Sequence, residues 1–233
     1  MTEELTPRPS LTSIAYARLK DAIVTCALPP GTRITERALA RDLDLGLTPV
    51  REGLGRLANE GLVITLPRRG YLVTPLTEHG VDELFQVWRH VCGAVAELAV
   101  INGTDEQLEH VIAVIETSLE REIGSAVDNR QGETLFEAFG QAAGNERLMA
   151  LFRALSTEIG RLFVLAYSEV EGQEILRNRP NRAFVTLIRR RDAEQLRKRV
   201  MAFNDANHEL VRKVLRTHPS LTAPSEPPVL ASE

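Results

Sequence analysis

Four arginines in the first third of the chain have the chemistry and placement to bind an anion. Arg37 and Arg51 lie on neighbouring segments with helical character, and Arg68 and Arg69 lie in a turn between two apolar runs. A guanidinium holds its N–H donors in one plane, which suits phosphate oxygens and the edge of a guanine. The first 75 residues carry ten basic and eight acidic side chains in a chain of net charge −4. These features indicate a nucleic-acid surface; the alternative is that the arginines are solvated surface charges.

Three helices and two strands are expected to position these arginines. The helices span residues 11–26, 36–43 and 49–60, and the strands span 62–66 and 71–73. Thr35 and Thr48 are expected to cap the second and third helices, and Gly61 ends the third. This order is the plan of a winged helix-turn-helix, whose second helix of the pair enters the major groove of DNA. Gly46, Thr48 and Arg51 then lie where base edges and phosphates are contacted.

Beyond Pro75 the pattern is helical only, which makes the fold class mainly α. Helices are expected at residues 78–101, 103–124, 132–143, 146–170, 171–191 and 192–215. Pro180 kinks or divides the fifth of these. The expected parts are a winged helix-turn-helix domain at 8–75, a linker at 76–77, an all-helical bundle of six or seven helices at 78–218, and a disordered tail at 219–233.

The sequence excludes several classes of protein. No run approaches 18 apolar residues, so no membrane-spanning helix is expected, and the acidic, Pro-bearing N-terminus is not a signal peptide. Cys26 and Cys92 fit neither a disulfide framework nor a metal site, which favours a reducing compartment. Phosphate-loop and nucleophile motifs of common enzymes are absent, and Glu133 and Glu137, four residues apart, are typical of a solvated helix face. We therefore expect a cytoplasmic protein that is not an enzyme.

Residues 11–73 resemble the DNA-binding domain of the GntR family of bacterial transcription regulators. The motifs that carry the resemblance are PGTRITE at 30–36, TPVRE at 48–52, RLANEGLV at 56–63 and GYLV at 70–73. The helical remainder resembles the effector domain of the FadR-like subfamily, called FCD. There the matching segments are AAGNERLMALF at 142–152 and RDAE at 191–194. The resemblance covers most of the chain and is stronger in its first third.

The resemblance implies that the front domain binds a double-stranded DNA operator. It places Arg37, Thr48 and Arg51 at the family's DNA-contacting positions and Gly70 at the wing tip. The full set of expected DNA-binding residues is Thr35, Arg37, Gly46, Thr48, Arg51, Arg68, Arg69 and Gly70. One departure is Gly46-Leu47 where the family usually has Ser-Arg. Leu47 cannot donate a hydrogen bond but can touch a thymine methyl group, so we expect an altered operator or weaker binding.

The resemblance also implies that the helical domain forms a homodimer and binds a small carboxylate, in many members beside a metal held by one Asp and three His. The corresponding positions here are Gly132, Phe136, Asn181 and Phe203. None keeps the family's ligand, and glycine and phenylalanine have no ligand atom to offer, so we expect no metal and no other cofactor. His208 lies about one turn beyond Phe203.

A second departure lies in the first helix of the bundle. Where the family commonly has an Arg and a Glu facing the pocket, this chain has Trp88 and Cys92. The expected effector pocket is therefore mostly apolar, lined by Trp88, Cys92, Phe136, Asn181 and Phe203. Such a lining suits a small organic effector with hydrophobic character, such as a hydrophobic carboxylate. The alternative is that these large side chains simply fill the space.

The sequence thus predicts a ligand-responsive bacterial transcription regulator, either a repressor or an activator. The expected assembly is a homodimer that binds its operator through the winged domains with an affinity set by the effector. The alternative is a degenerate family member that acts as a protein-interaction or ligand-sensing module with weak or no DNA binding.

Overall fold

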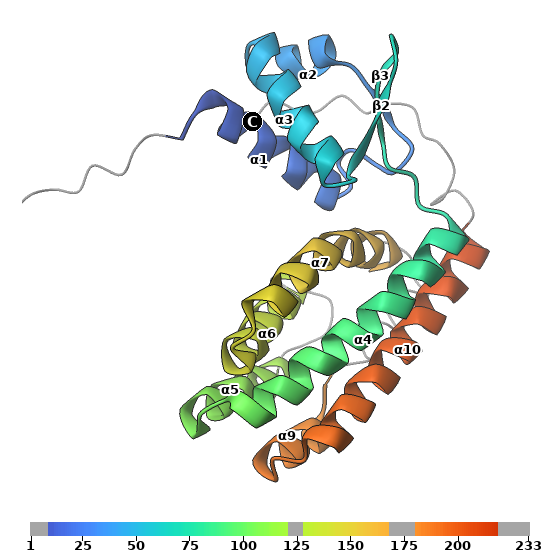
Figure 1. Cartoon of the computed structure of the whole chain (residues 1–233). Coiled ribbons are helices and arrows are strands. Elements are labelled where there is room, and N and C mark those ends of the chain that lie inside the picture. Colours follow the sequence, from blue (N-terminus) through green and yellow to red (C-terminus); the bar gives the residue numbers. More distant parts are fainter. Residues whose placement is uncertain (1–8, 121–127, 168–179, 219–233) are drawn as a thin grey trace, which may run out of the picture. The chain divides into compact units, whose positions relative to one another are not determined.

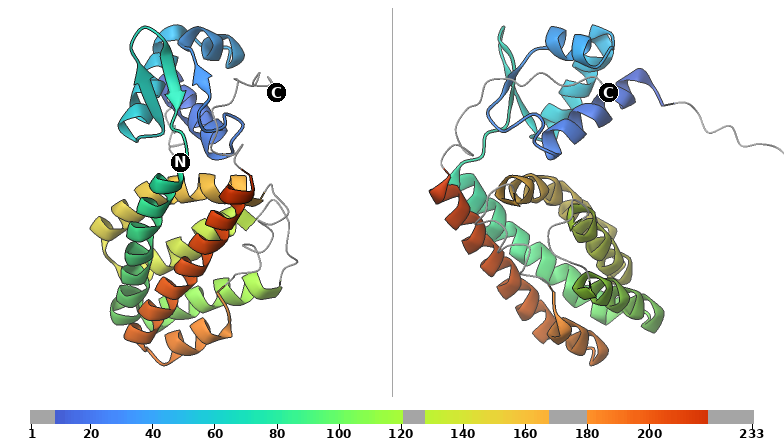
Figure 2. Two further views of the ribbon diagram at one scale, coloured as in Figure 1. Left: turned by 90° about the vertical axis from the view of Figure 1, so that its right-hand side faces the viewer. Right: turned by 180° about the vertical axis from the view of Figure 1, so that it is seen from behind.

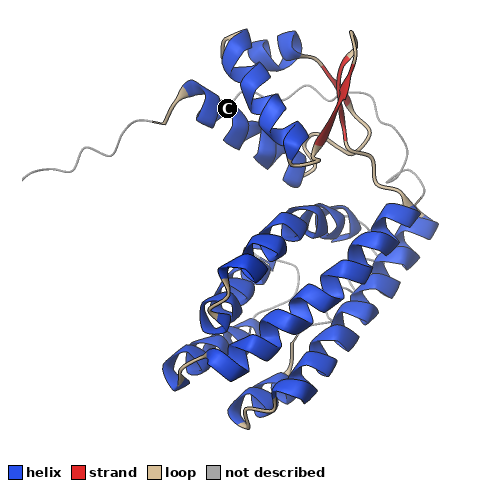
Figure 3. Ribbon diagram, in the orientation of Figure 1, coloured by secondary structure: helices blue, strands red, loops and turns tan. Residues whose placement is uncertain are grey.

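The computed structural model describes residues 9–120, 128–167 and 180–218, with the side chains of 128–134 left aside (Figure 1). The chain divides into two compact units, with the boundary between Leu76 and Thr77. The tail predicted to be disordered lies outside the described residues. Strands occur only in the first unit among the described residues, and the second is all helical (Figure 3). The fold class predicted from the sequence is confirmed: a winged helix-turn-helix followed by a helical domain.

The first unit contains three helices and a small antiparallel sheet. Its elements are α1 (Leu11–Val24), β1 (Arg33–Ile34), α2 (Glu36–Asp42), α3 (Leu47–Asn59), β2 (Val63–Leu66) and β3 (Gly70–Val73). The strand order is β1-β3-β2, so the two predicted strands acquire a third partner. Leu19 of α1 and Leu54 and Leu57 of α3 are fully buried in the core of this unit. Burial of this apolar stripe holds α3 against α1, with the opposite face of α3 exposed.

Thr35 caps α2 as predicted, because its side-chain oxygen accepts from the backbone N–H of Ala38 at 3.3 Å. The predicted cap of α3 is wrong. The helix begins at Leu47, its N-cap is Gly46, and Thr48 lies inside the first turn with its side chain exposed. Pro49 permits this earlier start, because the first N–H groups of a helix have no intrahelical partner and proline loses nothing there.

The second unit is a bundle around one central helix. Its elements are α4 (Glu78–Asn102), α5 (Asp105–Glu120), α6 (Asp128–Ala143), α7 (Glu146–Tyr167), α9 (Arg182–Arg189) and α10 (Ala193–Thr217). Helix α4 packs most extensively against α10 and also contacts α6 and α7 (Figure 2). It is long and apolar enough to cross a membrane by composition, but 56% of its most apolar window is buried within the protein. Its apolar surface is therefore the core of the bundle.

The predicted division of the fifth helix at Pro180 agrees with the structure from residue 180 onward. Pro180 precedes α9 instead of lying within it, and Asn181 is the N-cap, whose side-chain oxygen accepts from Ala183 N–H at 3.0 Å. Proline cannot donate an N–H and disfavours helix in the residue before it, so a helix starts more easily after it. The earlier part of that predicted helix lies outside the described residues.

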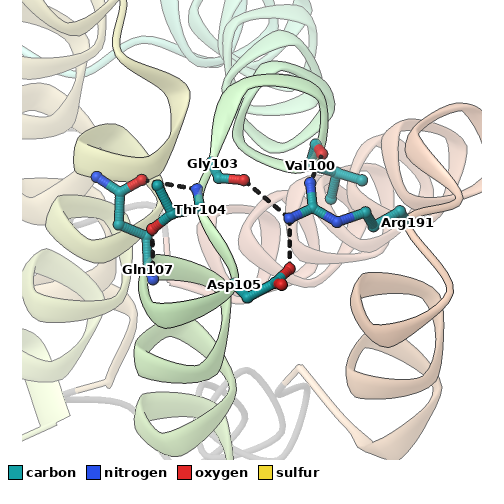
Figure 4. Close-up of polar contacts among 6 residues, drawn as sticks. All are labelled: Val100, Gly103, Thr104, Asp105, Gln107 and Arg191. Atoms are coloured by element: carbon teal, nitrogen blue, oxygen red, sulfur yellow. Dashed lines mark hydrogen bonds and ion pairs between the residues drawn. The ribbon is translucent and has the colours of Figure 1, made fainter.

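Arg191 joins three segments at one corner of the bundle (Figure 4). Its guanidinium donates to the carbonyl oxygens of Val100 and Gly103, each at 3.0 Å, and to Asp105 Oδ1 at 2.7 Å. The last carbonyls of a helix lack intrahelical partners, and Arg191 supplies one at the end of α4. Thr104 and Gln107 form a reciprocal cap at the start of α5 in the same corner.

Replacing Arg191 with alanine is expected to lower the free energy of unfolding of the helical unit by roughly 1–3 kcal/mol. The loss comes chiefly from the α4 carbonyls, because Asp105 is 96% exposed and an exposed ion pair contributes little. Urea unfolding followed by circular dichroism measures the change. Arg190→Ala removes the same charge at the neighbouring exposed position; equal losses in the two variants would contradict a capping role for Arg191.

Candidate functional site

The predicted DNA-contacting side chains lie on the surface of the winged unit. Arg37 is in the first turn of α2, Arg51 is in α3, and Arg68 and Arg69 are in the turn between β2 and β3; all four are exposed. Leu47, the departure from the family pattern, is the first residue of α3 and is 45% exposed. Guanidinium groups from two helices and the wing are thus presented to solvent by one small scaffold.

Contacts between elements show that the start of α2, the helix α3 and the start of β3 lie together. Nε of Arg51 donates to both carboxylate oxygens of Glu36 at 3.0 Å, and Nη2 donates to Oε2 at 2.7 Å. The hydroxyl of Tyr71, on β3, donates to Glu36 Oε1 at 3.4 Å. The hydrogen bonds from Arg51 lower the pKa of Glu36, so the carboxylate is charged at neutral pH. Sequence reasoning missed Glu36 as a partner of Arg51.

Gly70 is required by the fold at the beginning of β3. Its φ is +84°, and a Cβ added there would lie 2.5 Å from the carbonyl oxygen of Ile34. Strand β1 therefore approaches so closely that no side chain fits, whether or not DNA is near. Gly70 was expected at the wing tip from the family resemblance alone, and the close approach of Ile34 gives a reason for glycine within the protein.

We expect Gly70→Ala to lower the free energy of unfolding of the winged unit by about 1–3 kcal/mol, because alanine disfavours the left-handed backbone and its Cβ overlaps the Ile34 carbonyl oxygen. Thermal unfolding followed by circular dichroism tests this. The matched control is Gly55→Ala in α3, where an added Cβ meets nothing within 4 Å. That change should stabilise the helix by roughly 0.5–1 kcal/mol. A neutral Gly70→Ala variant would show that strand β1 can move away.

The residues predicted to line the effector pocket fall into different surroundings. Trp88 and Phe136 are in contact, with ring centroids 5.6 Å apart, and both contact Phe152, at 4.7 and 4.5 Å. We call these three side chains the aromatic cluster. Cys92, one turn along α4 from Trp88, is buried, and burial raises the pKa of its thiol well above the usual range. Phe152 was not anticipated from the sequence.

The other two predicted pocket residues have different roles. Phe203 on α10 packs edge-on against Phe184, with ring centroids 5.9 Å apart. Asn181 is exposed, and its side chain caps α9. Sequence reasoning also missed Arg161, which is 2% exposed on α7 and is the one charged side chain that is buried among the described residues. The structure therefore adds a positive charge to an interior that the sequence suggested was apolar.

His208 is held by neighbours of its own. Its Nε2 lies 2.8 Å from Asp82 Oδ1, and its ring stacks on Phe85 with centroids 4.7 Å apart. Within residues 9–120, 128–167 and 180–218, no group of three or more His, Cys, Asp and Glu side chains is placed to hold a metal ion. Of the positions expected from the family's ligand pattern, Gly132 lies in α6, and Phe136 belongs to the aromatic cluster.

Each of the two units matches a known family model. Residues 11–73 match the model of the gntR family of bacterial regulatory proteins, and residues 83–206 match the FCD domain. An uncharacterised HTH-type transcriptional regulator from the TAR-I ttuE-ttuC' intergenic region of Agrobacterium vitis is 31% identical over 140 residues, which cover 55% of this chain and 81% of that protein. The HTH-type regulator YdhC of Bacillus subtilis is 26% identical over 86% of this chain and 90% of its own length.

The solved structure of Escherichia coli McbR/YncC has the same fold. It superposes with a TM-score of 0.69 at 21% identity, covering 88% of this chain and 98% of that one. The two family models together account for both compact units, and the relatives named above are HTH-type transcriptional regulators. The chain therefore belongs to the GntR family of bacterial regulatory proteins, with an N-terminal winged helix-turn-helix and a C-terminal FCD domain.

Proposed function

We propose that this protein is a homodimeric, ligand-responsive transcription regulator that acts in the cytoplasm. Its winged units bind a double-stranded operator, and a small organic effector in the helical unit sets the affinity. The observation that carries the proposal is the exposed Arg51 on α3, fixed by Glu36 next to the arginine-bearing wing. An ordered guanidinium on a recognition helix is suited to a guanine edge or a phosphate.

In the proposed complex, each α3 enters a major groove. The two helices of a dimer reach successive grooves, about 34 Å apart. The first turn of α3 supplies Leu47 and Thr48, one for a thymine methyl group and the other for a base edge or phosphate. Arg68 and Arg69, in the wing turn, bind phosphate or enter the minor groove. The effector changes affinity by favouring one arrangement of the winged units through residues 74–77, and a coupling of about 1–3 kcal/mol suffices for a switch.

DNA binding is tested by fluorescence anisotropy with a randomised duplex pool and with fragments selected from it. We expect selection of a two-fold symmetric sequence and an affinity that falls steeply as the salt concentration rises, because phosphate contacts release counterions. A chain that selects no sequence, even in dilute buffer, would overturn the proposal. It would favour the alternative of an interaction or sensing module, for which the replacement of an arginine by the exposed Leu47 is the supporting observation.

For the effector we propose a carboxylate with hydrophobic character, bound without a metal. The aromatic cluster offers the apolar contacts, and Arg161 supplies positive charge within the same unit. Trp88 is the single tryptophan of the chain, so its fluorescence reports on the cluster. Benzoate and octanoate are suitable probes, with the matching alcohols as controls. A response to the alcohols alone would overturn the proposal that the effector is a carboxylate. Metal analysis that finds one zinc or nickel per chain would overturn the proposal that the site holds no metal.

A further inference from the structure

We infer that Glu36 is a specificity-determining positioning residue, which holds Arg51 so that the terminal edge of its guanidinium faces a guanine. This inference rests on the proposed function and deepens it. The supporting observation is that Nε and Nη2 of Arg51 already donate hydrogen bonds to Glu36 in the free protein.

A guanidinium has two edges that can donate a pair of parallel hydrogen bonds. The side edge consists of Nε and Nη2, and the terminal edge consists of Nη1 and Nη2. Glu36 accepts from Nε and Nη2, so it occupies the side edge. The terminal edge keeps the two donors that match O6 and N7 of guanine, the commonest specific contact between proteins and DNA. Arg51 can therefore bind Glu36 and a guanine at the same time.

Glu36 is well placed to act as a fixed support. It is the first residue of α2, directly after the Thr35 cap and the two residues of β1, so its backbone is held by both elements. Its side chain is 22% exposed, against 64% for Arg51, and Tyr71 donates to it from β3. The arginine thus projects from a partly buried anchor. A fixed side chain loses less entropy on binding than a free one.

The two effects of Glu36 on DNA binding have opposite signs, which makes the role testable. Its carboxylate repels phosphates and weakens binding to DNA of any sequence. Its hold on Arg51 strengthens the preference for one base. A residue with a merely structural role would change affinity for all sequences alike, and a residue that acts only by its charge would leave base preference unaltered.

The experiment selects bound duplexes from a randomised pool with the full-length protein and its variants, and measures affinity for unselected genomic DNA in parallel. We expect the wild type to select guanine at one position in each half-site. Glu36→Gln should lower the preference for guanine at that position about tenfold, keep the other preferred bases, and bind unselected DNA at least as tightly. Glu52→Gln is the control, because it removes the same charge from the position next to Arg51, where Glu52 accepts from Thr12.

Arg51→Lys is the second variant. Lysine keeps the positive charge but has no planar pair of donors, so it should lose the same guanine preference. The double variant should lose no more of the guanine preference than Arg51→Lys loses alone. If Glu36→Gln keeps the guanine preference while the wild type selects a clear operator, the inference is overturned and the proposed function stands. If the wild type selects no sequence, the proposed function fails and the inference with it.

Discussion

Arg51→Ala is expected to weaken binding of the dimer to the selected operator by about 30-fold or more, which is the largest effect we predict on function. A lost bidentate contact to guanine costs about 1–3 kcal/mol, and a symmetric dimer loses one such contact in each half-site. Binding to unrelated DNA should change far less, because it depends on the total charge. The measurement is fluorescence anisotropy with operator and unrelated duplexes at one salt concentration.

The matched control for Arg51→Ala is Arg153→Ala. Arg153 is an exposed arginine of α7, 3.8 Å from Glu146, in the unit that is not proposed to touch DNA. Both variants remove one positive charge, so any difference in their operator affinity comes from where the arginine lies. An operator affinity that falls equally in both would mean that Arg51 acts through net charge, and it would remove the principal support for the proposed recognition helix.

Trp88→Ala is expected to lower the free energy of unfolding of the helical unit by about 3–5 kcal/mol, the largest effect on stability. Trp88 is 3% exposed, and its ring contacts both other rings of the aromatic cluster. Truncation removes the buried ring and leaves a cavity on the central helix of the bundle. Circular dichroism in urea gives the change without relying on tryptophan fluorescence. Val87→Ala, at a neighbouring site that is 51% exposed, should change stability by less than about 0.5 kcal/mol.

The same variant decides between the two explanations of the aromatic cluster. If Trp88 fills space, the loss of stability is large, and benzoate added to the variant restores some of it by occupying the cavity. If Trp88 mainly contacts an effector, the loss is small and binding of the carboxylate probes is abolished. The direct ring contacts with Phe136 and Phe152 favour filling as the main role in the protein without ligand.

The elements of the fold were largely predictable because local chemistry sets them. Thr35 caps α2 where the sequence placed it, and Gly61, at φ +74°, ends α3. One local prediction was wrong. The start of α3 at Leu47 differs from the predicted start because the first N–H groups of a helix need no intrahelical partner, so several starting points satisfy the chemistry of Pro49. The prediction that Pro180 kinks or divides the fifth helix agrees with α9, which begins at Arg182.

Contacts between elements were much less predictable. Strand β1 has two residues, too few for any periodicity, and it exists because Arg33 and Ile34 pair with β3 far along the chain. Glu36 and Arg51 lie 15 residues apart on different helices, so no spacing rule links them. In the helical unit, counting along a family pattern placed Trp88 beside Phe136 but gave no sign that Phe152 completes the aromatic cluster.

The central pairing of the helical unit has a consequence for how the protein is made. Helices α4 and α10 are the first and last elements of that unit, and α10 is the most extensive partner of α4. The winged unit is complete by residue 76 and has its own core. Domains fold as units during synthesis, N-terminal first. We therefore expect the winged unit to fold while the chain is still being synthesised, whereas the part of the apolar face of α4 that α10 covers stays exposed to chaperones and neighbouring nascent chains until α10 is made.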